Sequence, residues 1–221
     1  MMDNPFETSA SIYDQWYDDF PRTFQCEILA LRALLPPPGE WVEIGVGTGR
    51  FAVELGIRLG VEPAEGMAAL ARHRGIDVIR GRAEALPLAT ASMEAVFFIT
   101  TLCFVQDVQM AMAEAFRALR PGGYGIVGFL PLDSPWGKVT QARAADDRFF
   151  KHARLRTKNE VFDALEAAGF VIQQTSQTLI GSLEDLETCA PSQEEGHDRG
   201  SFIVLRAAKA AQSPPPSEHP A

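Results

Sequence analysis

Cysteine is scarce in this sequence of 221 residues: it occurs only as Cys26, Cys103 and Cys189, with no Cys-x-x-Cys pair. Disulfide frameworks and zinc sites place several cysteines or histidines at characteristic spacings, so neither a disulfide framework nor a metal site is expected. The sequence also lacks an apolar run long enough to cross a bilayer, and residues 1–10 show neither the basic start nor the apolar stretch of a secretory signal. These absences predict a cytoplasmic protein that does not act at a membrane.

Positive charge is in deficit as well. Lysine and arginine number 20 against 29 aspartate and glutamate residues, for a net charge of -9. A field of this sign repels a polyanion, so nucleic acid is not expected as a substrate. One segment, residues 138–158, is locally basic; it could attract an acidic small molecule, but such a cluster is more often the solvated face of a helix.

What the sequence does contain is enough apolar material, 46% of residues, for one sizeable core. Residues 11–35 have the apolar spacing of helical segments, interrupted near Pro21, and residues 210–221 are expected to form a disordered tail. Between them, helical patterns alternate with seven strand-like runs, at residues 41–44, 57–61, 77–80, 95–100, 124–130, 170–180 and 201–206. This alternation predicts an α/β fold with a doubly wound, mostly parallel, seven-stranded sheet. Only an acidic loop separates the last two runs, so they are expected to pair antiparallel.

A glycine turn follows the first expected strand, in the order Glu43-Ile-Gly45-Val-Gly47-Thr-Gly49. Glycines without a Cβ let a ligand approach the backbone, and ligands of parallel sheets bind at the carboxyl ends of the strands. Nicotinamide and flavin enzymes use a related pattern, G-x-G-x-x-G, from which this turn differs by one residue. Glu43 argues against a dinucleotide cofactor, because a carboxylate there repels a pyrophosphate. It can instead hold the amino and sulfonium ends of a cationic cofactor.

Four blocks in this order, residues 42–52, 60–63, 81–88 and 119–123, resemble those of the class I S-adenosyl-L-methionine-dependent methyltransferases of the small-molecule type, similar to methyltransferase domain 11. The resemblance extends from about residue 13 to residue 206. It implies a Rossmann-like methyltransferase fold in a single domain, residues 1–209, with an antiparallel last strand. It also implies S-adenosyl-L-methionine as the cofactor and a small molecule as the methyl acceptor.

The resemblance carries over to individual cofactor contacts. Glu62, after the second strand, matches the acid that accepts hydrogen bonds from both ribose hydroxyls. Pro63 and Met67 match apolar positions against the ribose and adenine, although Met67 fits a helix core equally well. Thr100, at the end of the fourth strand, matches a position that contacts the methionine part of the cofactor, or is simply a strand-end hydroxyl.

The adenine end departs from the family pattern. Where the family usually has an aspartate for the adenine amino group, this sequence has Arg82, so we assign that contact to the backbone of Ala83 and to Glu84. The complete cofactor set predicted from the resemblance is Glu43, Gly45, Val46, Gly47, Gly49, Glu62, Pro63, Met67, Ala83, Glu84 and Thr100.

The acceptor side is less determined, and neither the acceptor nor the oligomeric state is predicted. In similar enzymes the amino-terminal helices, here residues 1–39, form a lid, and an insertion, here residues 131–156, covers the substrate. The arginines of this insertion are therefore candidate substrate contacts, together with Tyr17, Thr101 and Trp136. The candidates for a general base are Tyr13, Cys103 and His152.

Two other functions remain open from the sequence. A nicotinamide-binding Rossmann oxidoreductase would share the glycine turn. A non-catalytic module that binds the cofactor without transferring a methyl group is compatible with Arg82 and with the absence of an obvious base.

Overall fold

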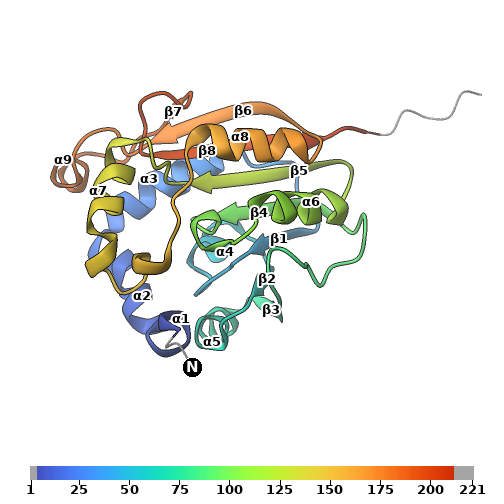
Figure 1. The fold of residues 1–221 in the computed structure, drawn as a ribbon, viewed down its shortest axis with the longest axis horizontal. Helices are drawn as coiled ribbons and strands as arrows, with labels where there is room; N and C mark the ends of the chain where they lie inside the picture. Colours follow the sequence, from blue (N-terminus) through green and yellow to red (C-terminus); the bar gives the residue numbers. More distant parts are fainter. Residues whose placement is uncertain (1–3, 212–221) are drawn as a thin grey trace, which may run out of the picture.

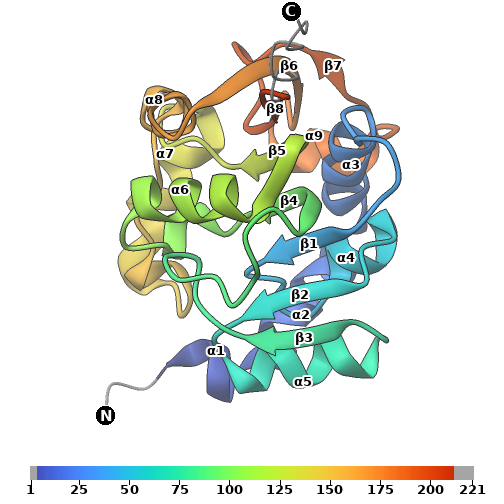
Figure 2. The ribbon, with the colours of Figure 1, turned by 90° about the vertical axis from the view of Figure 1, so that its right-hand side faces the viewer.

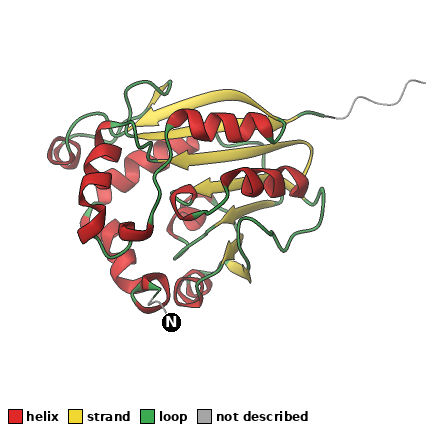
Figure 3. Ribbon diagram, in the orientation of Figure 1, coloured by secondary structure: helices red, strands yellow, loops and turns green. Residues whose placement is uncertain are grey.

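The computed structural model describes residues 4–211, in which helices pack on both faces of one sheet (Figures 1 and 3). The strands are β1 (Trp41–Ile44), β2 (Leu59–Glu62), β3 (Asp77–Arg80), β4 (Met93–Ile99), β5 (Leu119–Phe129), β6 (Phe170–Thr178), β7 (Glu194–Glu195) and β8 (Phe202–Lys209). The α-helices are α1 (Pro5–Thr8), α2 (Ala10–Asp19), α3 (Pro21–Arg32), α4 (Arg50–Leu55), α5 (Glu65–His73), α6 (Val108–Ala118), α7 (Pro135–Arg143), α8 (Lys158–Ala167) and α9 (Leu183–Thr188). Short 3-10 turns are η1 (Leu102–Phe104), η2 (Ala144–Asp146) and η3 (Phe150–His152).

The strands form one sheet in the order β3-β2-β1-β4-β5-β8-β6-β7. Strands β1 to β5 pair parallel, whereas β8 runs antiparallel to both β5 and β6. The α/β class, the mostly parallel sheet and the antiparallel last strand are thus confirmed. The predicted number of seven strands is wrong by one, because two residues after α9 pair with the outer edge of β6 as β7.

The core lies on both faces of this sheet. On one face, β-strand residues such as Val96 and Phe98 pack with residues of α6 and α8, including Met112 and Leu165. The opposite face is covered by α3 and α4, as the edge-on view in Figure 2 shows. The central strand β4 is buried on both sides, as its unbroken apolar run predicts.

Local sequence signals explain most helix ends. Asp107 caps α6 by accepting a hydrogen bond from the Met110 backbone N–H, and Thr157 with Glu160 forms the predicted capping box of α8. The start of β2 differs from the prediction, since the Ile57 N–H still bonds the Ala52 carbonyl at the end of α4. The strand therefore begins two residues later, at Leu59.

The acidic segment between β6 and β8 is also different from the prediction of a loop. Helix α9 forms there because Ser182 and Asp185 make a reciprocal capping box, and Glu187 accepts hydrogen bonds from Thr23 of α3. The partner that stabilises α9 thus lies far away in the sequence. The predicted disordered tail, residues 210–221, falls almost entirely outside the described residues.

Helices α1, α2 and α7 lie at the end of the sheet toward which the parallel strands point (Figure 1). The predicted lid, residues 1–39, and the predicted insertion, residues 131–156, supply these helices. None of the helices within residues 4–211 is long and apolar enough to cross a membrane.

Candidate functional site

The turn after β1 is held by its neighbours. The Gly45 N–H donates to the Val61 carbonyl at 2.7 Å, which extends the pairing of β1 with β2. Gly45 has φ +68°, and a Cβ on it would lie 2.4 Å from Cγ2 of Thr101. Thr101 follows β4, so only a glycine here lets the ends of β1 and β4 come together. The Thr101 side chain therefore packs against the turn, and its hydroxyl donates to the Gly45 carbonyl at 3.4 Å.

Gly47 is less crowded. Its φ of +55° favours glycine, yet a Cβ there would meet only the Gly45 carbonyl oxygen at 3.9 Å and Cε of Met67 at 4.0 Å, which are ordinary contact distances. The space above this part of the turn is therefore accessible to a ligand that touches the backbone.

Glu62 ties the second strand to this turn. Its carboxylate is 7% exposed and accepts hydrogen bonds from the N–H groups of Gly47 and Ala64, both at 3.0 Å. Burial raises the pKa of Glu62 in spite of these two hydrogen bonds, which act in the opposite direction. The carboxylate is thus held in one orientation at the carboxyl end of β2.

Glu43 lies almost fully buried in β1, with 1% of its surface exposed, and its Oε2 atom has no hydrogen-bond partner within the described residues. Burial, and secondarily the negative charge of Glu62, raises the pKa of Glu43 well above its ordinary value. A buried acceptor without a donor is costly, and a cationic or N–H-bearing ligand would remove that cost. The chemistry of this position fits the amino and sulfonium ends of the predicted cofactor.

The other predicted cofactor residues surround these two acids unevenly. Met67, a residue of α5, is buried against the amino-terminal helices next to Ala10, whereas Pro63 is exposed. Ala83 is buried, and the Glu84 Oε1 atom accepts a hydrogen bond from the Gln106 backbone N–H. The Arg82 side chain is 63% exposed and lies 3.8 Å from Glu84.

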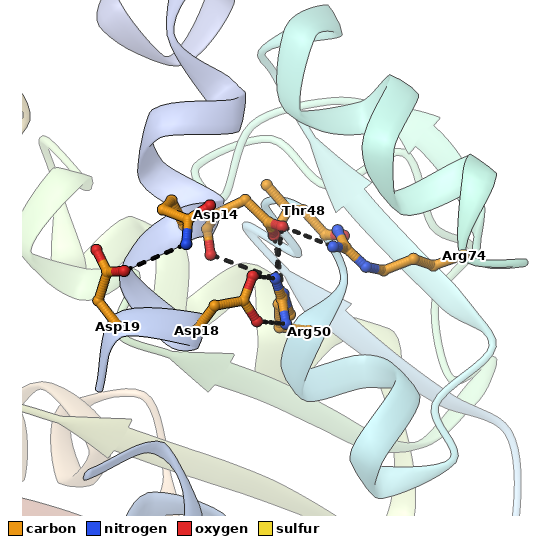
Figure 4. A network of polar contacts seen from close by, with 7 residues as sticks. Asp14, Asp18, Asp19, Thr48, Arg50 and Arg74 are labelled. Atoms are coloured by element: carbon orange, nitrogen blue, oxygen red, sulfur yellow. Dashed lines mark hydrogen bonds and ion pairs between the residues drawn. The ribbon is translucent and has the colours of Figure 1, made fainter. Parts of the chain in front are cut away.

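An ion-pair network links helix α2 to the glycine turn (Figure 4). Asp14 of α2 bonds Arg50, the first residue of α4, and Arg74, which follows α5; Arg50 also bonds Asp18. Arg74 in turn donates to the Thr48 carbonyl at 2.7 Å. Burial opposes ionisation of Asp14, but these arginines lower its pKa to about 2. Helix α2 is thus bound directly to the turn.

Aromatic rings from separate elements meet beside this network. Phe6 of α1 lies 4.9 Å, centroid to centroid, from Phe104 of η1 and 5.5 Å from Phe149, which precedes η3. Tyr13 of α2 lies 5.2 Å from Phe149. Edge-to-face and tilted contacts of this kind join α1 and α2 to η1 and to the segment that precedes η3.

Under these rings lies a cavity of about 820 Å³. Helices α2, α3, α7 and α9 enclose it together with the ends of β4 and β5. Tyr13, Tyr17, Thr100, Cys103 and Trp136 line it, as do Arg143 and Arg156 among the arginines of the insertion. Thr100 adopts a left-handed conformation with φ +52°, a strained backbone that turns the chain where β4 ends.

The three candidates for a general base are not equivalent. His152 is exposed on η3 and is not part of the cavity lining. Cys103 and Tyr13 do line it, but burial raises the pKa of each to about 12. Both are therefore protonated at neutral pH and are suited to donate hydrogen bonds rather than to accept a proton. The Cys103 thiol already donates to the Thr100 carbonyl at 3.4 Å.

Glu27 is a cavity residue that sequence reasoning missed. It lies on α3, is 6% exposed, and reaches the cavity together with the tyrosines of α2. The signal was present in the sequence: Glu27 falls at helical spacing among Thr23, Ala30 and Leu31, on the buried face of the helix. An acid on an apolar stripe is a functional candidate when no partner neutralises it.

This chain is similar in sequence and in fold to known methyltransferases. Residues 42–127 match the methyltransferase domain family. A solved structure from Thermotoga maritima, described as an S-adenosylmethionine-dependent methyltransferase and possible histamine N-methyltransferase, is 40% identical; it covers 92% of this chain and 97% of that chain, with a TM-score of 0.88. An uncharacterised protein of Methanocaldococcus jannaschii is 33% identical over 93% of this chain and 99% of that protein. The malonyl-acyl-carrier-protein O-methyltransferase of Methylococcus capsulatus is 32% identical over 69% of this chain and 59% of that protein.

Proposed function

Because this chain belongs to the S-adenosyl-L-methionine-dependent methyltransferases, we propose that it transfers a methyl group to a small molecule bound in the 820 Å³ cavity. The observation that carries this proposal is the position of Thr100 and Thr101. Thr100 lines the cavity, and the neighbouring Thr101 contacts Gly45 of the glycine turn, so the acceptor cavity and the cofactor turn meet at the end of β4. Because the chain belongs to this family, the alternative function considered from the sequence, a nicotinamide oxidoreductase, is no longer favoured.

The cofactor side is built from the turn and the two buried acids. When bound, S-adenosyl-L-methionine supplies an electrophilic methyl group on a sulfonium. Glu62, held by Gly47 and Ala64, is oriented to accept hydrogen bonds from the ribose hydroxyls, and Glu43 offers its unpartnered oxygen to the cationic part. Gly47 leaves the backbone open to the approach of the ligand.

The rest of the predicted cofactor set has supporting roles in this proposal. Val46 and Gly49 complete the turn, and Met67 and Pro63 border it from the side of α5. At the adenine end the Ala83 backbone is the proposed donor. Glu84 can offer the adenine its Oε2 atom, which forms no hydrogen bond within the described residues and lies 3.8 Å from Nε of the exposed Arg82.

On the acceptor side, positioning and the exclusion of water are the proposed contributions of the protein. The lid, residues 1–39, and the insertion, residues 131–156, close over the cavity through the aromatic contacts of Phe6, Tyr13 and Phe149. Tyr17 and Trp136 lie against the acceptor. Tyr13 and Cys103 act as hydrogen-bond donors, because burial keeps both protonated at neutral pH.

The cofactor assignment is tested by calorimetry with S-adenosyl-L-methionine and its demethylated product. Glu62→Ala should weaken both affinities by about 100-fold, since two hydrogen bonds to a charged group are lost at about 1.5–3 kcal/mol each and water restores part of that loss. The matched control is Glu65→Ala, which removes an exposed acid three residues away on α5. Equal affinities of Glu62→Ala and Glu65→Ala would contradict the assignment.

Transfer itself is tested with a methyl-labelled cofactor against a panel of amines, alcohols, thiols and acids. Label in any product supports methyl transfer. Tight cofactor binding without product across the panel would instead favour the non-catalytic module.

A further inference from the structure

The cavity contains a carboxyl group without a partner. Glu27 projects from α3 with 6% of its surface exposed, and it forms no hydrogen bond or ion pair with any of residues 4–211. Burial of this kind normally demands a partner, because an isolated carboxylate in an apolar environment is costly. A partner for the charged form of Glu27 would therefore have to come from outside the described residues.

The charged groups around Glu27 do not neutralise it. Burial alone raises the pKa of Glu27 to about 8, and neither Arg143 nor Arg156, which line the same cavity, contributes to that value. Arg156 is turned toward the loop before α6, where it donates to the Val105 carbonyl at 2.8 Å. The titratable groups that do face Glu27 are Tyr13 and Tyr17, whose own pKa values are raised by burial. The carboxyl thus lacks a positive neighbour.

Aromatic and aliphatic side chains surround this carboxyl. Tyr13, Tyr17 and Trp136 present rings to the cavity, and such rings attract a cation. The cavity also has an exposed apolar rim formed by Ile12 and Val139, which are 55% and 52% exposed. A buried acidic group and an exposed apolar rim together suit a ligand with a positive charge at one end and an apolar body.

We propose that the methyl acceptor is an amphipathic amine, whose protonated nitrogen pairs with the Glu27 carboxylate among the aromatic rings while its apolar part lies against Ile12 and Val139. Because an ammonium has no lone pair, this pairing binds and positions the acceptor and is not the state that attacks the methyl group. This inference rests on the proposed function, because it takes the cavity to be the acceptor site. The negative net charge of the chain, -9, also favours the capture of a cation over that of an anion.

The test is calorimetry on the full chain saturated with S-adenosylhomocysteine. The ligands are 2-phenylethylamine, tryptamine and hexylamine, each compared with the alcohol of the same carbon skeleton. At least one amine should bind about tenfold or more tighter than its alcohol. Glu27→Gln should abolish this preference, and Glu184→Gln, a change at an exposed acid of α9, should leave it intact.

A second measurement needs no variant. Near pH 7 the Glu27 carboxyl is mainly protonated, so pairing with an ammonium should release about one proton, counted from titrations in two buffers of different ionisation enthalpy. The alcohols should release none. Alcohols that bind as tightly as all three amines, a preference that survives Glu27→Gln, or amine binding without proton release would each overturn the proposal. Failure of S-adenosylhomocysteine to bind would instead contradict the proposed function, so the two failures are distinguishable.

Discussion

Glu27→Gln removes a buried ionisable group with almost no change of shape, and its effect on stability should depend on pH in a defined way. Burial raises the pKa of Glu27 from 4.5 to about 8. Below the lower value the carboxyl is protonated in both the folded and the unfolded chain. As the pH rises between the two values, the unfolded chain releases the proton and the folded chain keeps it. The wild-type protein therefore loses stability over this range, and the glutamine variant does not.

The size of the effect follows from the shift. A shift from 4.5 to about 8, at about 1.4 kcal/mol per pKa unit, corresponds to at most about 5 kcal/mol of unfolding free energy. Denaturant unfolding at about pH 4 should give nearly equal stabilities for the two proteins. At about pH 8.5 the variant should be the more stable one, by several kcal/mol.

The control for this comparison is Glu184→Gln, which alters an exposed acid and should track the wild type at both pH values. Only the difference between variant and wild type is interpreted, so other titrating groups cancel. Parallel profiles for Glu27→Gln and wild type would refute the reasoning, because they would mean that Glu27 ionises in the folded chain as readily as in the unfolded one.

Two further predictions concern the glycine turn and the lid. Gly47→Ala and Gly56→Ala both place an alanine at positive φ with no close contact, so thermal unfolding should show a similar loss of about 1 kcal/mol of stability for each. Only Gly47→Ala should also weaken the binding of S-adenosylhomocysteine. Equal binding by the two variants would refute the role of Gly47. Asp14→Asn should cost about 2 kcal/mol near neutral pH, because Arg50 and Arg74 lower the pKa of Asp14 from 3.8 to about 2 despite its burial. That contribution is lost as the pH falls through about 2, so urea titrations should show the deficit shrinking in acid, and a deficit independent of pH would contradict the ion-pair explanation.

Some elements of the fold can be predicted from the sequence and others cannot. The first glycine turn and the strands on either side of it are predictable, because the apolar strand, the glycines and the following helix are contiguous along the chain. The capping box of α8 is predictable for the same reason. Helix α9 is not, because the bonds from Thr23 to Glu187 join segments 164 residues apart.

In the candidate site, too, some features follow from contiguous sequence and others only from tertiary packing. The sequence by itself determined the fold class, the family and the acids that flank the glycine turn, since all of these depend on short blocks with a fixed spacing. Only the tertiary structure decided which side chains share the cavity: it excludes His152 from the lining, keeps Cys103 and Tyr13 protonated, and brings Glu27 into the cavity without a partner among residues 4–211. The physical reason is that burial and the absence of a neutralising charge are properties of the packed neighbourhood, to which helices distant in sequence contribute.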